Sequence, residues 1–256
     1  MTTLGKYLLL WWKLTENSFL VSLTNRFNAI LFFIGKILRF GFFIVFLLAL
    51  FTRTEFLAHY SVAQVVFFFL TFNFIDTVAY RFRPMVVSGD FDLVLVKPIN
   101  PLFRALAGGA DPLDLFMLIP YIGALIYVAT RLGTVSFLSL SLYVLLLING
   151  FLIATGFHIL VLALAIMTTE IDHTIMIYRD VTSMGRVPVD IYREPLRSML
   201  TFVIPVGVMM TFPAKAFLGF LSPVAIVVAL ILGMLFLLLC LRIWRYSLSL
   251  YASASS

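Results

Sequence analysis

Long apolar runs recur along the chain and constrain its fold more than any other feature. A helix needs about 20 consecutive apolar residues to cross bilayer hydrocarbon, where its backbone must bond to itself. Hydrophobic residues make up 62% of the chain and charged residues 12%, more apolar surface than a soluble domain can bury. We therefore predict an all-α polytopic membrane protein, with one transmembrane domain over residues 1–256. The strong spans are 27–51, 60–80, 111–130, 137–168 and 222–241.

The N-terminal stretch differs from these runs. Between residues 3 and 18, Leu4, Leu8 and Trp11 follow helical spacing, and lysines interrupt the apolar face. Tryptophan prefers the headgroup level, and lysine suits an anionic inner leaflet. We predict an amphipathic helix that lies in the cytoplasmic interface.

The segment after residue 168 is the hardest to assign. Residues 171–187 are amphipathic and form a weak fifth span that would need other helices around it. Residues 188–219 contain Pro195, Pro205 and Pro213, and their apolar run is too short to cross. Because proline interrupts a helix, we predict a re-entrant or interfacial helical hairpin here, outside the cytoplasm.

The distribution of basic residues favours six spans with both termini in the cytoplasm. Nine basic residues then lie inside: Lys6, Lys13, Arg26, Arg81, Arg83, Lys97, Arg104, Arg242 and Arg245. Five lie outside: Arg53, Arg131, Arg193, Arg197 and Lys215. Cytoplasmic loops carry the excess of lysine and arginine. In a five-span alternative, Arg242 and Arg245 would lie on the outer side of the membrane, which the same rule disfavours.

The motifs of several chemistries are missing from the sequence. It has no P-loop, no H-E-x-x-H and one cysteine, Cys240, so neither ATP nor zinc binding is indicated. His59, His158 and His173 are far apart in the sequence and are interpreted as packing or interface residues rather than ligands. Asp111 and Asp114 begin a span, where they favour the helix dipole. Scattered basic residues argue against nucleic acid. We predict a non-enzymatic chain with no cofactor.

Besides Asp111 and Asp114, three charged residues lie inside the strong predicted spans. Lys36 and Arg39 share one helix face, and Asp76 lies in the next span. A charge facing lipid costs about 2.5–3.5 kcal/mol on insertion scales. An ion pair between the two spans is one interpretation, and a basic wall for an anionic substrate headgroup is the other.

Two blocks of sequence resemble the ABC-2 type permeases, the membrane half of many ATP-binding-cassette exporters. The loop GDFDLVLVKPINPLFRAL is similar to the G-x-[LF]-D-x-x-L-x-x-P-x-N-P-L pattern of a short-permease subfamily. A second block, beginning RVPVDIYREP, looks like a proline-marked block of the same subfamily. The matching residues are Gly89, Asp92, Leu95, Pro98, Asn100, Pro101, Leu102, Pro188, Ile191, Tyr192, Pro205, Pro213 and Ala214.

The resemblance implies that the loop at 84–104 carries a coupling helix that docks on a separate ATPase. Apolar side chains would make the contact, acidic ones would orient the partner, and prolines would stiffen the return to the membrane. A solvated loop with incidental prolines is the alternative. The coupling candidates are Gly89, Asp90, Phe91, Asp92, Leu95, Lys97, Pro98, Asn100 and Pro101.

The resemblance further implies an export permease in the inner, or cytoplasmic, membrane. Two ATPase subunits, which hold ATP and Mg²⁺, and a second permease subunit, identical or paralogous, would complete it. Pro188, Tyr192, Pro205 and Pro213 are candidates for the outer gate. The substrate expected is lipid-like, glycan-linked or amphipathic. The alternative is an ATPase-independent channel or assembly scaffold.

Overall fold

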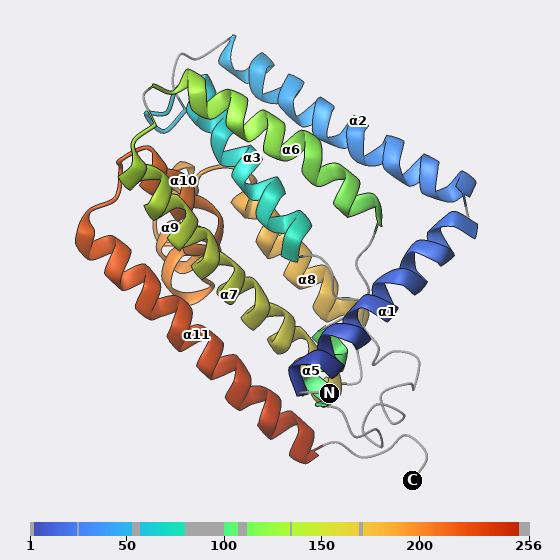
Figure 1. Ribbon diagram of the computed structural model, residues 1–256. Coiled ribbons are helices and arrows are strands. Elements are labelled where there is room, and N and C mark those ends of the chain that lie inside the picture. The colour runs from blue at the N-terminus through green and yellow to red at the C-terminus, as the bar shows by residue number, and fades with distance from the viewer. Residues whose placement is uncertain are drawn as a thin grey trace. The chain divides into compact units, whose positions relative to one another are not determined.

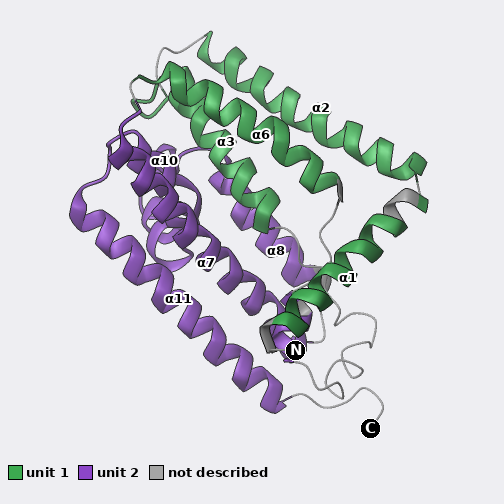
Figure 2. Ribbon diagram, in the orientation of Figure 1, with its two compact units in different colours: residues 1–81, 107–133 green, residues 82–106, 134–256 purple. Residues whose placement is uncertain are grey.

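The computed structural model describes residues 3–24, 26–52, 57–79, 100–106, 112–133, 135–168 and 171–250. The regular structure of these residues is helical, apart from a single bridge between Leu57 and Tyr60 (Figure 1). The contacts group the chain into two compact units (Figure 2). Unit 1 comprises Met1–Arg81 and Ala107–Gly133, and unit 2 comprises Phe82–Leu106 and Thr134–Ser256.

Five described helices are long and apolar enough to cross a membrane, which supports the predicted class of protein. The shortest, α3, has 18 residues and spans about 27 Å, close to the hydrocarbon thickness of about 30 Å. The longest, α7, has 32 residues. The five are α2 (Arg26–Phe51), α3 (Val62–Ala79), α6 (Pro112–Arg131), α7 (Phe137–Thr168) and α11 (Pro223–Leu250).

Unit 1 is organised around α3, which is apolar on nearly all sides and mostly buried. A helix of that pattern belongs in an interior. The ring of Phe69 stacks on Phe43 at 4.3 Å and on Phe40 at 5.6 Å between ring centroids. Phe40 also meets Tyr121 of α6 at 4.9 Å. Aromatic pairs therefore join α2, α3 and α6.

The N-terminal helix of unit 1, α1 (Thr3–Thr24), is longer than the predicted 3–18. Its Lys13 and Glu16 form an exposed ion pair, and Trp12 is 61% exposed. These features suit an interfacial helix, whose place in the membrane stays a prediction.

In unit 2, α7 and α11 pack side by side through small residues. A methyl group on Gly233 of α11 would collide with the Asn149 side chain, and one on Gly156 of α7 would lie 2.9 Å from Phe236. The Asn149 amide donates a hydrogen bond to the carbonyl of Ala229, at 3.0 Å. Small residues and interhelical polar bonds are the usual means by which membrane helices associate.

The structure shortens the helix predicted over 171–187. The helix α8 runs only from Ile171 to Ser183, 13 residues or about 20 Å, and is followed by the short turn η1 (Met184–Arg186). It is too short to cross alone. The sequence Met184-Gly185-Arg186 does not continue the α-helix, since glycine is a poor helix former.

The chain from Val187 to Gly219 is broken into short pieces. They are η2 (Val189–Ile191), α9 (Leu196–Ser198), η3 (Met199–Val203), η4 (Gly207–Thr211) and α10 (Phe212–Phe217). The last two runs, Leu196–Val203 and Gly207–Phe217, are bent by 79°. We call residues 184–217 the bent segment. The break falls at Pro205, whose missing N–H and ring interrupt the helical ladder.

Candidate functional site

Most of the predicted coupling residues, Gly89, Asp90, Phe91, Asp92, Leu95, Lys97 and Pro98, lie outside the described residues. The described end of the loop explains its Asn-Pro-Leu sequence. The Asn100 side-chain oxygen accepts hydrogen bonds from the backbone N–H groups of Leu102 (2.9 Å) and Phe103 (3.3 Å). Asn100 is thus the N-cap of α5 (Pro101–Leu106), and Pro101 is its first residue. The sequence carried this helix-start signal, which we interpreted only as stiffening.

The helix α5 rests on an apolar cluster of unit 2. Leu102 and Leu106 pack against it. We call this set of buried residues the inner cluster: Ile159, Leu162, Ala163, Ile166, Cys240 and Trp244. It joins the C-terminal part of α7 to that of α11. Cys240 is 1% exposed and packs inside this cluster.

The charged residues of unit 1 pair differently from the prediction. Lys36 forms its ion pair with Asp114 of α6, at the first turn of that helix, rather than with Asp76. Asp114 is thus more than the dipole partner expected. Arg39 is exposed.

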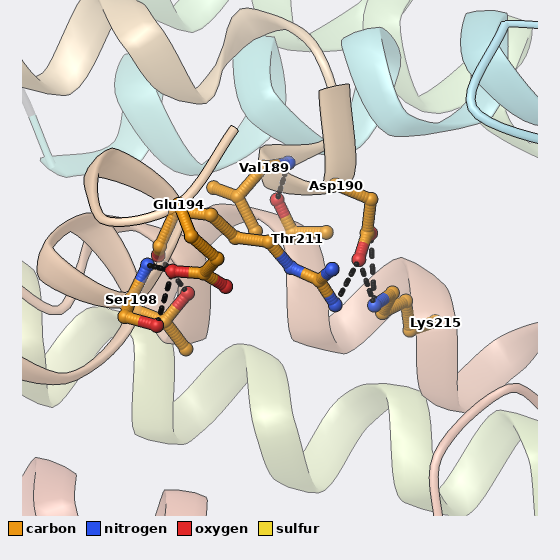
Figure 3. A network of polar contacts seen from close by, with 8 residues as sticks. Val189, Asp190, Glu194, Ser198, Thr211 and Lys215 are labelled. Carbon is orange, nitrogen blue, oxygen red and sulfur yellow. Dashed lines mark hydrogen bonds and ion pairs between the residues drawn. The ribbon is translucent and has the colours of Figure 1, made fainter. Parts of the chain in front are cut away.

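The bent segment holds an ion cluster at its centre (Figure 3). Asp190 of η2 accepts a hydrogen bond from Lys215 of α10 at 2.9 Å, and its second oxygen lies 2.8 Å from the same Nζ. Arg197 of α9 lies 3.0 Å from the first oxygen. The side chains of Asp190 and Lys215 are only 13% exposed. One carboxylate therefore joins three separate pieces of the chain, and the cluster carries a net positive charge.

Hydrogen bonds to the backbone supplement this cluster. The N–H of Val189 donates to the Thr211 hydroxyl at 3.3 Å (Figure 3). The Tyr192 hydroxyl donates to the carbonyl of Met184 at 2.9 Å. The Ser198 hydroxyl donates to the exposed Glu194 carboxylate. Short helical pieces leave backbone groups free, and these side chains satisfy some of them.

The candidate gate residues take distinct places in the bent segment. Pro188 directly precedes η2, Pro205 stands at the break, and Pro213 is buried near the start of α10. Tyr192 fixes the turn after η1. Close contacts tighten the arrangement, since a methyl group on Gly207 would lie 3.0 Å from the Thr201 hydroxyl. The ion cluster between residues 25 apart was not predicted, because no sequence spacing indicates it.

The described residues contain no group of three histidine, cysteine, aspartate or glutamate side chains placed to hold a metal ion. His158 is 7% exposed, and its Nδ1 lies 2.6 Å from the carbonyl of Ala154 in the same helix. Its ring meets Tyr178 of α8 edge-on, at 5.0 Å between centroids. It has the packing role expected of it.

Comparison with known protein families gives a match over most of the chain. The sequence model described as ABC-2 family transporter protein matches residues 37–255, which include most of unit 1 and all of the described part of unit 2. No curated protein and no solved structure gave a match.

Proposed function

The chain belongs to the ABC-2 transporter family, and from that membership we propose that it is the permease subunit of an exporter driven by a separate ATPase. The observation that carries the proposal is the family match over 37–255. Members of the family are transmembrane components that associate with ABC ATPases, and five apolar helices make this chain a multi-pass membrane protein. The direction of transport, the subunit composition and the class of substrate go beyond the family match and are our proposals.

We propose that the chain crosses the membrane six times and that two consecutive segments together form the fifth crossing. The helix α8 covers about 20 Å, and the bent segment would complete the passage in the outer half. Irregular backbone at membrane depth is tolerated where protein or water covers it, and many of the groups of the bent segment are bonded internally. With the basic residues distributed as above, both termini lie in the cytoplasm and the bent segment faces outward.

In this proposal the loop at 84–104 docks on the ATPase. Two ATPase subunits hold ATP and Mg²⁺, and two permease subunits, identical or paralogous, flank the pathway. Binding of ATP closes the ATPases and displaces the docking loops. Transport follows only if the inward-open and outward-open states bind substrate with different affinity. The bent segment, with Pro188, Tyr192, Pro205 and Pro213, forms the outer gate.

The substrate that we favour is lipid-like, glycan-linked or amphipathic. Of the two interpretations of the intramembrane charges, we favour pairing for Lys36, and its ion pair with Asp114 supports this choice. Arg39 is the better candidate for an anionic headgroup, because it is exposed on a helix that is mainly apolar. Lys36→Ala should therefore reduce the amount of folded protein, whereas Arg39→Ala should leave assembly intact and reduce transport.

Copurification tests the proposal. The tagged chain, solubilised in mild detergent, should bring down a P-loop ATPase in stoichiometric amount. Replacing Phe91 and Asp92 by alanine should release the ATPase and leave the permease folded. The matched control replaces Phe27 and Asp180, two exposed residues of the same types. A folded preparation without an ATPase would instead support a channel or an assembly scaffold.

A further inference from the structure

A hollow between α2 and α6 of unit 1 belongs to none of the sites described above. It has a volume of about 240 Å³ and lies near the beginning of both helices. It is open on one side, since Ile30 is 60% and Phe116 is 55% exposed. We call it the α2–α6 groove. The side chains that line it are all apolar: Ala29, Ile30, Phe33, Leu113 and Phe116.

The groove ends where α2 and α6 come into contact. Beyond Phe33, the two helices are joined by the Lys36–Asp114 ion pair and by the rings of Phe40 and Tyr121, 4.9 Å apart between centroids. The ion pair occupies the carboxylate nearest to the groove, so that this carboxylate does not repel an anion there. An apolar hollow in a membrane protein is a natural place for an apolar chain from the surrounding lipid.

A cation stands at the other end of the groove. Arg26 is the first residue of α2 and is exposed. Ala29, Ile30 and Phe33 follow it by three, four and seven residues, which places them on the same face of the helix. Helical side chains lean toward the N-terminus, so Arg26 extends away from the apolar part of the groove. Its guanidinium has several N–H donors, which suit a phosphate group.

The dimensions fit a phospholipid. Arg26 and Phe33 lie about 10 Å apart along the helix axis, and one leaflet of the hydrocarbon core is about 15 Å thick. A lipid with its phosphate at Arg26 would therefore place much of one acyl chain along the groove. Arg39, the candidate for substrate contact, lies about 20 Å from Arg26 along the same axis. The groove is thus separate from that contact.

We propose that the α2–α6 groove binds one anionic phospholipid, with its phosphate on Arg26 and an acyl chain against Ala29, Ile30 and Phe33. The apolar lining selects a lipid chain, and the arginine at the end of the groove selects a negative headgroup. The groove requires only that the chain spans a membrane. Its assignment to the cytoplasmic leaflet, which is rich in anionic lipid, rests on the proposed function, which places the start of α2 on that side.

Photocrosslinking locates the lipid. The chain is reconstituted in phosphatidylcholine vesicles that contain a small fraction of phosphatidylglycerol with a diazirine on one acyl chain, and crosslinked peptides are identified by mass spectrometry. At residues 29–33 and 113–116 we expect about fivefold more crosslinks than with phosphatidylcholine that carries the same diazirine. Apolar faces elsewhere should react equally with both probes. Equal reaction at the groove as well would overturn the proposal.

Two variants test the two halves of the site. Arg26→Gln should remove the preference for the anionic probe, whereas Arg39→Gln, at another exposed arginine of α2, should retain it. Ala29→Phe fills the groove and should lower its crosslinks to the level of the neutral probe. Ala49→Phe, at an exposed alanine near the other end of α2, is the matched control. If Ala29→Phe does not fold, the exposed Arg26 still provides the test.

Three further results would contradict the proposal. Loss of the preference in Arg39→Gln but not in Arg26→Gln would place the lipid at the substrate contact. Competition by excess glycerol phosphate would show a site for free phosphate rather than for a lipid. Unchanged crosslinks in a folded Ala29→Phe variant would show that no acyl chain occupies the groove. None of these measurements needs an ATPase, so their failure leaves the exporter proposal standing, and failure of copurification leaves the lipid site standing.

Discussion

Two regions of unit 2 are held together by different kinds of interaction: the α7–α11 pair and the bent segment. The pair consists of two unbroken helices whose contact depends on Gly156, Gly233 and one hydrogen bond from Asn149. The bent segment consists of six short pieces joined by the ion cluster and by hydrogen bonds to the backbone.

The difference follows from the backbone. A continuous helix satisfies its own N–H and C=O groups, so its partner has only to fit closely. A broken chain frees several of these groups, and polar side chains must then satisfy them. Substitutions should therefore disturb the pair through shape and the bent segment through charge and hydrogen bonding. The bent segment is held by a few polar bonds, so the free-energy cost of breaking them and changing its conformation is modest.

The largest effect is expected for Gly233→Leu. The new side chain would collide with Asn149 and break its bond to Ala229, so the free energy of unfolding should fall by about 3 kcal/mol or more. Thermal unfolding in detergent measures it. Gly35→Leu on α2, where no atom lies within 4 Å of an added methyl, is the control. Equal stability of the two variants would contradict the close contact.

Asp190→Ala should have the next largest effect. It leaves Lys215, which is only 13% exposed, beside Arg197 without the carboxylate, and we expect a loss of about 2 kcal/mol. Additional replacement of Lys215 by methionine should recover part of the loss. The control is Glu16→Ala in the exposed pair with Lys13, which should cost about 0.5 kcal/mol or less. If both variants cost the same, the cluster does not hold the bent segment.

Tyr192→Phe should cost about 1 kcal/mol at neutral pH, because it removes the bond to the Met184 carbonyl. Thermal unfolding in detergent, compared with wild type, measures the loss. Equal stability of the two proteins would show that this hydrogen bond does not hold the turn after η1.

Gly219→Ala should have the smallest effect. Gly219 has φ of +74° and, with Phe220, returns two backbone bonds to the end of α10, to the carbonyls of Ala216 and Lys215. The left-handed backbone costs an alanine about 1 kcal/mol, since no steric contact opposes the methyl. Gly123→Ala inside α6 is the control and should be neutral or stabilising.

The sequence predicted the continuous helices well. The helix α7 occupies the range 137–168 expected for the fourth span, and α2 begins one residue before the expected 27. Such helices can be predicted from the sequence because each needs only sufficient length and an apolar composition. By contrast, α11 runs to Leu250, beyond the expected 241, because a helix can continue past the lipid.

The bent segment and the charge pairs were less predictable. The prolines predicted the break at Pro205. The ion pairs and hydrogen bonds that hold the bent segment together, however, join residues far apart in the sequence. From the sequence, either Asp76 or Asp114 could be the ion-pair partner of Lys36. Only the packing of the helices shows that the partner is Asp114. The 13-residue length of α8 escaped prediction because its sequence remains amphipathic beyond Ser183.

The central claim is that an ATPase on the cytoplasmic side moves the bent segment on the other side. The most direct test places one cysteine at Val203, which is 70% exposed, in a Cys240→Ser background. Proteoliposomes that contain the permease–ATPase complex are labelled with a membrane-impermeant maleimide, with and without ATP and vanadate. We expect labelling from the outer side at a rate that nucleotide trapping changes severalfold. An identical rate in both states, in a complex that hydrolyses ATP, would contradict the account.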